Sequence, residues 1–369
     1  MLSTQKLNSW VNIQEGEPLI IAGPCSAETD EQLYETARMV QQQGVNIIRA
    51  GVWKPRTRPN TFEGVGLEAL PWIQHIKEEL GVQFAIEVAR ADHVEAALKA
   101  GIDVLWIGAR STVSPFIVQE IADALKGTDV PVLVKNPINP DLALWMGALE
   151  RLNQAGITKL GAIHRGFSSH QKTRYRNVPS WHLPIELKRQ LPDMPMICDP
   201  SHIAGKREMV PEISQIALDL NFEGLIIETH RDPERAWSDA RQQVTPGNLG
   251  EMIKALQVRK SSSSDIDFIT QLENLRTQID HADRELLEAM SRRMELVGQI
   301  GTHKKQKNVA AFQLERWNEV FKTRQQWANE LDIKEKFITD LFNLIHVESI
   351  KKQTEVMDNM GKEVKNKVD

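Results

Sequence analysis

Short apolar runs alternate with longer amphipathic stretches through the first two thirds of the chain, as in parallel strands joined by crossover helices. Eight runs fit strands, at residues 19–25, 46–51, 83–88, 104–109, 131–136, 160–166, 194–200 and 224–230. Eight such units in about 258 residues is the usual size of a TIM (β/α)8 barrel. A doubly wound sheet is the alternative, but the nearest match to its glycine fingerprint, GVGLEA at 64–69, follows no strand. We therefore predict a barrel.

The last third of the chain has a different pattern. From Asp265 to about Gln306 apolar residues recur at helical spacing without a proline, and two further helical stretches follow at about 313–330 and 334–357. A helix of about 40 residues is about 60 Å long, which exceeds the diameter of a domain of this size. We expect an all-α unit of three helices whose long helix is covered by a second chain. A dimerising coil is the simpler interpretation.

A run of four serines in RKSSSSDID, at 259–267, marks a flexible connector, and all 17 prolines precede it. The chain is therefore divided into a barrel domain at 1–258, a serine-rich linker at 259–265, a helical domain at 266–357 and a polar tail at 358–369.

The composition limits the cellular location and the classes of partner that we expect. The chain is 41% hydrophobic and 26% charged, and it contains no apolar stretch of membrane-spanning length and no secretion signal at its start. We expect a cytoplasmic protein with no membrane partner. The net charge of −5 argues against a nucleic-acid partner. Cys25 and Cys198 are expected to be thiols, because a large domain in a reducing compartment has little use for a disulfide.

Ionisable residues follow one predicted strand after another. Barrel enzymes build their active sites at the C-terminal strand ends, whereas Val, Ile and Leu fill the interior. The series consists of Cys25, Arg49, Glu87, Arg110, Lys135, His164 with Arg165, Asp199 with His202, and Glu228 with His230. A packing role does not explain so many charges at one level, and we expect an active site there.

Two chemistries separate within this region. Cys25, His202, Glu228 and Asp239 offer sulfur, nitrogen and oxygen donors, a mixed set that suits Mn, Fe, Co or Zn better than Mg or Ca. A thiol packed as a small hydrophobe is the alternative for Cys25, and the expected role of Cys198.

The second chemistry is cationic and predicts a small substrate with several anionic groups. Its members are Arg49, Lys54, Arg56, Arg110, Lys135 and Arg165, and Thr57 of KPRT adds a hydroxyl and an amide for a phosphate cradle. Lys135 could instead form a Schiff base in a metal-free aldolase, but the metal-like set favours a charged clamp.

The motifs of the barrel half resemble those of the type Iβ class of 3-deoxy-D-arabino-heptulosonate 7-phosphate (DAHP) synthases. They are AGPCS (22–26), IRAGVWKPRTRP (48–59), IGAR (107–110), VLVKN (132–136), HRG (164–166), DPSH (199–202), IIETH (226–230) and SDA (238–240). The resemblance implies condensation of phosphoenolpyruvate with erythrose 4-phosphate, using a divalent metal: Mn²⁺ foremost, or Co²⁺, Fe²⁺ or Zn²⁺.

By that resemblance Cys25, His202, Glu228 and Asp239 match the metal ligands, and Lys54 lies between the two substrates as a proton donor. Arg49, Lys54, Arg110, Lys135 and Arg165 match the groups that hold phosphoenolpyruvate, and Arg56 with Thr57 matches the cradle for the sugar phosphate. A related family uses arabinose 5-phosphate, and KPRT favours the four-carbon sugar over that alternative.

Cations also recur on the long predicted helix. Arg293 and Lys304 are eleven residues apart and lie on nearly one face, so both could reach one small dianion. Arg276 precedes Arg293 by seventeen residues, about 25 Å along the axis, and would have to reach into a partner's site.

This half resembles the AroQ class of chorismate mutase over 266–357, through LRTQIDHADRELLEAMSRRMELVGQIGTHK, FQLERW and LFNLIHVESIKKQ. The resemblance implies a homodimer with shared sites that rearranges chorismate without a cofactor. The matching positions are Arg276, Arg293, Lys304, Arg316, Ser349 and Gln353, with Arg293, Lys304 and Gln353 as the catalytic ones. Gln313 and Trp317 depart from the familiar pattern.

A non-catalytic regulatory and dimerisation module is the alternative for the helical half. In either case the fusion predicts feedback on the barrel by chorismate or prephenate. The loop at 167–181 is expected to be a lid or a contact for the other domain.

Overall fold

The computed structural model describes residue 10 and residues 17–55, 61–170, 172–260 and 262–365. Contacts within the chain divide it into two compact units, residues 1–261 and residues 262–369.

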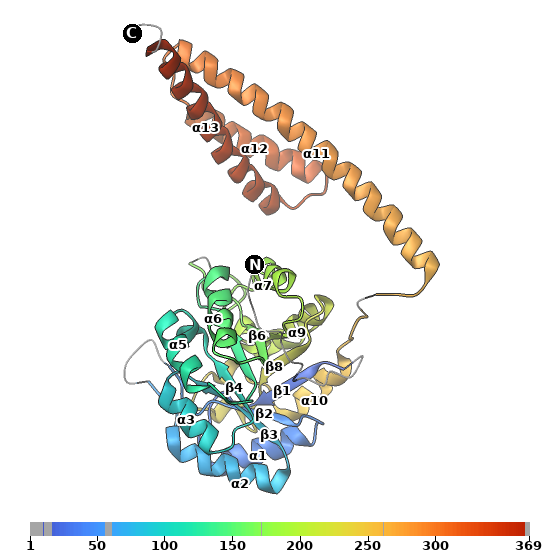
Figure 1. The fold of residues 1–369 in the computed structure, drawn as a ribbon. Helices are drawn as coiled ribbons and strands as arrows, with labels where there is room; N and C mark the ends of the chain where they lie inside the picture. Colours follow the sequence, from blue (N-terminus) through green and yellow to red (C-terminus); the bar gives the residue numbers. More distant parts are fainter. Residues whose placement is uncertain (1–9, 11–16, 56–60, 171, 261, 366–369) are drawn as a thin grey trace. The chain divides into compact units, whose positions relative to one another are not determined.

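The first unit is a closed barrel of eight parallel strands in sequence order, with β1 paired to β8 (Figure 1). The strands are β1 (Leu19–Gly23), β2 (Ile47–Ala50), β3 (Gln83–Val88), β4 (Val104–Ile107), β5 (Val132–Lys135), β6 (Leu160–His164), β7 (Met196–Cys198) and β8 (Gly224–Glu228). Each lies within one of the eight apolar runs, which confirms the predicted fold.

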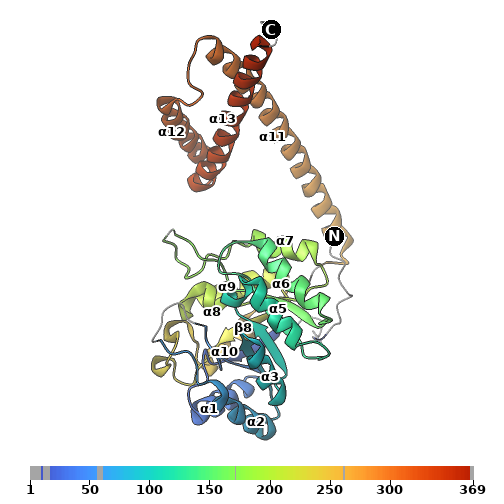
Figure 2. The same ribbon diagram turned by 60° about the vertical axis from the view of Figure 1, so that its left-hand side comes forward.

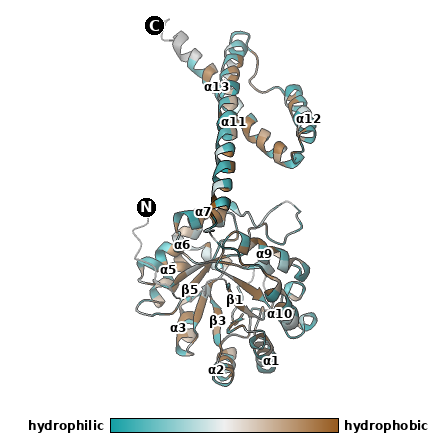
Figure 3. Cartoon of the chain, turned by 90° about the vertical axis from the view of Figure 1, so that its right-hand side faces the viewer, coloured by the Kyte–Doolittle hydropathy of each residue, from teal (hydrophilic) through white to brown (hydrophobic). Residues whose placement is uncertain are grey.

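Helices surround the barrel (Figures 1 and 2). They are α1 (Asp30–Gln41), α2 (Ala69–Leu80), α3 (Ala91–Lys99), α4 (Ala109–Thr112), α5 (Pro115–Ala124), α6 (Leu142–Gln154), α7 (His182–Gln190), α8 (Pro200–Ala204), α9 (Val210–Asp219) and α10 (Pro246–Ala255). Their apolar faces pack on the outward side chains of the strands in one continuous core. Figure 3 shows this division as hydrophobic strands inside a largely hydrophilic exterior.

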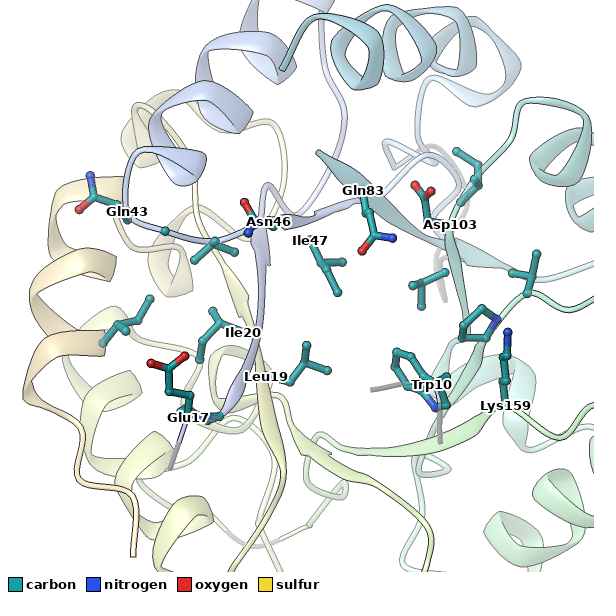
Figure 4. Close-up of a pocket in the computed structure, with 18 of the residues that line it drawn as sticks. Trp10, Glu17, Leu19, Ile20, Gln43, Asn46, Ile47, Gln83, Asp103 and Lys159 are labelled. Carbon is teal, nitrogen blue, oxygen red and sulfur yellow. The ribbon is translucent and has the colours of Figure 1, made fainter. Parts of the chain in front are cut away.

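The inward side chains of the strands form a separate apolar layer that includes Trp106 and Ile226. Trp10 packs against this layer, and its indole Nε1 donates to the carbonyl oxygen of Leu160 at 2.9 Å. A cavity of about 1060 Å³ lies around Trp10 (Figure 4). Because its lining includes the N-terminal ends of several strands, this cavity lies at the end of the barrel opposite the charged groups described below.

The second unit consists of α11 (Ile266–Gln306), α12 (Leu314–Glu330) and α13 (Glu335–Lys365), with α13 packed against both other helices. Gly301 marks a close approach of α11 to α13, since a Cβ there would lie 3.1 Å from the Cα of Gln353. Among the described residues, no helix is long and apolar enough to cross a membrane.

Candidate active sites

A cluster of potential metal ligands lies at the C-terminal end of the barrel. Cys25 follows β1, Glu228 ends β8 and Asp239 lies in the loop after β8. The three ligand atoms all lie within 4.8 Å of one another, and Cys25 Sγ is 3.3 Å from Asp239 Oδ2. His202, on α8, lies outside that group, with its Nε2 3.8 Å from Glu228 Oε1. The residues predicted as ligands therefore gather at one place.

The donor set fits a divalent transition metal. Glu228 is fully buried, and its Oε1 makes no hydrogen bond to a described residue, although Arg49 Nη2 lies 3.1 Å from it as an ion pair. A buried carboxylate is costly unless a cation neutralises it, and the Arg49 guanidinium supplies one such charge. A thiol and a second carboxylate face the same space, which matches the mixed ligands of such metals.

The protonation states in the cluster follow from burial and charge. Burial and the Glu228 carboxylate raise the pKa of Cys25 to about 12. Burial lowers the pKa of His202, so its imidazole is neutral, the form that binds metals. Burial disfavours ionisation of Asp239, yet the positive charges of Arg176 and Lys54 hold its pKa below the usual range.

Lys54 lies directly beside the thiol. Its Nζ donates to Cys25 Sγ at 2.6 Å and to the Cys25 carbonyl oxygen at 3.0 Å. Gly51 permits this approach, because a Cβ there would lie 2.1 Å from the Cys25 carbonyl oxygen. Arg56 and Thr57, predicted as a phosphate cradle, lie outside the described residues.

Two buried cations face the indole of Trp106. Arg49 Cζ lies 5.2 Å and Lys135 Nζ 5.6 Å from the ring centroid. Arg49 Nη2 is 3.1 Å from Glu228 Oε1, whereas its Nε and Nη1 are buried without a hydrogen-bond partner among the described residues. Lys135 Nζ donates to Asp199 Oδ2 at 2.8 Å. The unpartnered donors of Arg49 point to an anionic ligand.

Arg165 and Arg110 extend this cationic surface. Arg165 is 9% exposed, and its Nη1 donates to Asn177 Oδ1 at 2.8 Å. Burial lowers the pKa of Arg165 to about 10, and the charge of Arg110, at the start of α4, acts in the same direction. These two guanidinium groups are thus close enough to repel each other.

His164 does not belong to the site, contrary to its place in the strand-end series. Its ring centroid lies 5.0 Å from that of Trp181 and 5.8 Å from that of Phe167, in the packing outside the strands. Burial lowers its pKa to about 3. Alternation along β6 explains the difference, because Ile163 faces the barrel interior and its neighbour must face outward.

The helical unit brings together Arg293, Ser349 and Gln353. Arg293 Nη1 donates to Ser349 Oγ at 2.6 Å. Gln353 is 7% exposed, and its Oε1 has no hydrogen-bond partner among the described residues. Lys304 Nζ donates to the carbonyl oxygen of Ala311 at 2.6 Å. Burial lowers the pKa of both Arg293 and Lys304.

Arg276 and Arg316 remain apart from this group. Each pairs at 2.6 Å with a glutamate on its own helix, Arg276 with Glu273 and Arg316 with Glu319. Both side chains are about three-fifths exposed. Within a single chain, the structure gives these two cations local partners only.

Two aromatic side chains occupy the same region. The rings of Trp317 and His346 lie 3.5 Å apart between centroids. Burial, with the charges of Arg293 and Lys304, lowers the pKa of His346. His346 is not predictable from the sequence, because a lone histidine among apolar helix positions has no spacing that distinguishes it from a core residue.

A barrel with charged side chains gathered at its C-terminal strand ends is the arrangement of a (β/α)8 enzyme. Residues 4–263 match the model of the DAHP synthetase I family, and the chain belongs to that family. Residues 275–354 match the model of chorismate mutase type II. The chain thus joins a DAHP synthase domain to a chorismate mutase domain, as the motifs predict.

Known proteins resemble the barrel half. A phospho-2-dehydro-3-deoxyheptonate aldolase from Thermotoga maritima is 30% identical over 247 residues, which cover 67% of this chain and 71% of that protein. A 2-dehydro-3-deoxyphosphooctonate aldolase from Rhodopseudomonas palustris is 28% identical over 257 residues, 64% of this chain and 86% of that protein. A crystal structure of the Thermotoga maritima DAHP synthase superposes with a TM-score of 0.60 at 28% identity, covering 68% of this chain and 72% of that chain.

Proposed function

We propose that the barrel condenses phosphoenolpyruvate with erythrose 4-phosphate to DAHP, the entry step of aromatic amino acid biosynthesis, and that the helical domain rearranges chorismate to prephenate. The observation that carries the first assignment is the cluster of Cys25, Glu228 and Asp239, which lies beside Lys54 and beside the unpartnered guanidinium donors of Arg49. A metal-binding set and an anion-binding set meet there, and the condensation needs both.

In this proposal the cations hold the carboxylate and phosphate of phosphoenolpyruvate. Arg49 on β2 and Lys135 on β5 both lie over the Trp106 ring, and Asn177 orients the buried Arg165. Planar guanidinium groups bind such oxygens in pairs. The binding residues are Arg49, Lys54, Arg110, Lys135 and Arg165, and Arg56 with Thr57 would take the phosphate of erythrose 4-phosphate.

Cys25, His202, Glu228 and Asp239 would hold the divalent metal, Mn²⁺ foremost, which supplies a Lewis acid for the aldehyde of the sugar. C3 of phosphoenolpyruvate forms a bond to the aldehyde carbon, and the aldehyde oxygen takes a proton from Lys54. Water adds to the resulting cationic C2, and the carbon keeps the water oxygen as inorganic phosphate leaves. Lys54 is suited to its step because its ammonium already points into the cluster.

The contacts of Lys135 favour a clamp over a Schiff base. Its Nζ pairs with the fully buried Asp199 at 2.8 Å. A nucleophilic lysine must lose its proton, whereas an adjacent carboxylate stabilises the ammonium form. We therefore assign Lys135 to charge-based binding of the substrate carboxylate.

In the mutase domain, Arg293 and Lys304 would hold the carboxylates of chorismate in a folded conformer, and Lys304 with Gln353 would stabilise charge on the ether oxygen. The unpartnered Oε1 and low exposure of Gln353 support its role. The homodimer completes each site: Arg276 enters from the partner, and Arg316 and Ser349 contact the substrate.

The decisive test of the barrel is phosphate release from phosphoenolpyruvate with erythrose 4-phosphate, before and after EDTA, with Mn²⁺ added back. EDTA should abolish activity and Mn²⁺ should restore it. Cys25→Ala should remove activity, whereas Cys198→Ala, whose thiol packs in the core outside the strands, should retain it. Arabinose 5-phosphate in place of erythrose 4-phosphate tests the sugar. EDTA-insensitive activity would overturn the metal assignment and favour a Schiff base at Lys135.

The mutase assignment is tested by loss of chorismate from solution with the full chain. Lys304→Gln should reduce kcat by two orders of magnitude or more, because the variant removes the charge that stabilises the ether oxygen. Arg284→Gln is the matched control, since Arg284 lies on the same helix but pairs with Glu288 at the surface. No turnover by the parent chain would favour a regulatory and dimerisation module.

A further inference from the structure

The second half of the loop between β6 and α7 is built into the wall of the metal-ligand cluster. Phe167 and Val178 exchange two backbone hydrogen bonds of 2.8 Å. The backbone N–H of Arg176 donates to the carbonyl oxygen of Ile203 at 3.0 Å, within α8. Gly205 leaves room for Arg176, since a Cβ there would lie 2.5 Å from Arg176 Cβ. Arg176 is therefore fixed at its backbone.

The guanidinium of Arg176 reaches both carboxylates of the cluster. Its Nη1 donates to Asp239 Oδ1 at 2.9 Å and to Gln242 Oε1 at 2.6 Å. Gln242 is 1% exposed, and its Nε2 donates to Glu228 Oε2 at 2.6 Å. One nitrogen thus contacts one carboxylate directly and the other through a single amide.

These contacts occupy one oxygen of each carboxylate and leave the other oxygen facing the cluster. Asp239 Oδ2 lies 3.3 Å from Cys25 Sγ. Glu228 Oε1 makes no hydrogen bond to a described residue and lies 3.8 Å from His202 Nε2 and 3.1 Å from Arg49 Nη2. Hydrogen-bond partners behind a metal ligand commonly fix its orientation in this way.

We propose that Arg176 is a positioning residue that, together with Gln242, selects which oxygens of Asp239 and Glu228 face the metal. This inference rests on the proposed function, which assigns these carboxylates to metal binding. It also explains why the loop after β6 packs where it does, because the loop braces the cluster through Arg176. In this role Arg176 acts through the two carboxylates and not on the substrate.

The direction in which metal affinity changes on replacement of Arg176 distinguishes a positioning role from a purely electrostatic one. A guanidinium beside a cation site repels the cation, so removal of its charge alone would strengthen metal binding. Loss of an orienting hydrogen bond has the opposite effect and typically weakens metal affinity 10- to 100-fold. We therefore expect Arg176→Gln to bind Mn²⁺ about tenfold more weakly than the parent chain.

The experiment is a Mn²⁺ titration of the full chain, with free Mn²⁺ read by electron paramagnetic resonance. Gln242→Met should weaken binding similarly, and the double variant should add little, because both substitutions break one network. Arg174→Gln is the control, since Arg174 lies two residues away and pairs with Glu212 at the surface. If Arg176→Gln does not fold, Gln242→Met alone tests the proposal.

Parental Mn²⁺ affinity, or a higher one, in folded Arg176→Gln and Gln242→Met would overturn the positioning role. That failure differs from failure of the proposed function, in which the parent chain itself would bind no Mn²⁺. Because the readout is metal affinity, the result does not depend on turnover.

Discussion

The protonation of a single thiol should make the proposed metal binding by the barrel pH-dependent. Burial and Glu228 raise the pKa of Cys25 to about 12, so the metal-free chain carries the thiol form at neutral pH. A metal ligand must be the thiolate, and binding therefore expels the proton. Since the pH is below that pKa, Mn²⁺ affinity should rise with pH, about tenfold per unit. Because burial lowers the pKa of His202, its imidazole releases no further proton near neutrality.

Calorimetry in buffers of different ionisation enthalpy measures this proton directly. The parent chain and Cys198→Ala should release about one proton per Mn²⁺, and Cys25→Ala should lose that release. Equal affinities at two neutral pH values one unit apart would show that Cys25 is not a thiolate ligand.

We expect Asn177 to support phosphoenolpyruvate binding indirectly, by holding the Arg165 guanidinium in place. Its Oδ1 accepts from Arg165 Nη1 at 2.8 Å, and its Nδ2 donates to the His202 carbonyl oxygen at 2.6 Å. Asn177→Ala frees the Arg165 guanidinium, so the KM for phosphoenolpyruvate should rise about tenfold, the loss expected for one hydrogen bond to a charged group. Steady-state kinetics with the exposed Asn139→Ala as control checks this, and an unchanged KM would contradict it.

The proximity of Cys25 and Glu228 was predictable from the sequence. The apolar runs that precede them locate the ends of two strands, and strand ends meet at one end of a barrel. Asn177, Arg176 and Gln242 were not predicted. Arg176 and Asn177 lie in a loop and Gln242 ends a short 3-10 helix, and most of their partners are far away along the chain, so nothing in local spacing marks them. Their roles depend on tertiary contacts alone.

At the scale of elements, α11 presents an apolar stripe that needs a partner. Leu275, Ile279, Leu286 and Met290 are all exposed, and at 100° per residue they lie within about 60° of one another around the helix axis. A stripe of this kind is usually buried against another helix. A second copy of α11 is the partner that the proposed homodimer provides.

The substitution Leu286→Glu should therefore shift the full chain from dimer toward monomer and lower mutase activity with it, because the variant places a charge within the interface. Arg284→Gln lies on the opposite side of α11 and should leave the dimer unchanged. Sedimentation at several concentrations measures both. A dimer that tolerates Leu286→Glu would place the interface elsewhere.

Element boundaries were predictable to different degrees. All eight strands fall within the predicted runs because β-branched apolar clusters bounded by turns fit few other structures. Helix α13 continues to Lys365, beyond the predicted stretch that ends at 357. Polar composition suggested a tail there, but Lys and Glu are good helix formers, and composition alone cannot mark the end of such a helix.

At the scale of the whole molecule, the fusion predicts feedback from the mutase domain to the synthase. A ligand alters a distant activity only if it binds two states of the protein with different affinity. Chorismate and prephenate are both expected ligands, because each has two carboxylates that match the cations of Arg293 and Lys304. Prephenate is the ligand to test, because the mutase does not consume it. We expect prephenate to slow phosphate release by the full chain. The Lys304→Gln variant should lose that response, and its own rate without prephenate is the reference.

Reciprocity makes the coupling testable from the other side. If prephenate weakens binding of phosphoenolpyruvate by some factor, phosphoenolpyruvate must weaken binding of prephenate by the same factor. Calorimetric titration of prephenate into the full chain, with and without saturating phosphoenolpyruvate, measures that factor free of turnover by the barrel. Inhibition of rate with no change in either affinity would mean that prephenate acts on a catalytic step after binding. If prephenate changes neither the rate nor either affinity, ligand binding to the mutase domain does not regulate the synthase domain.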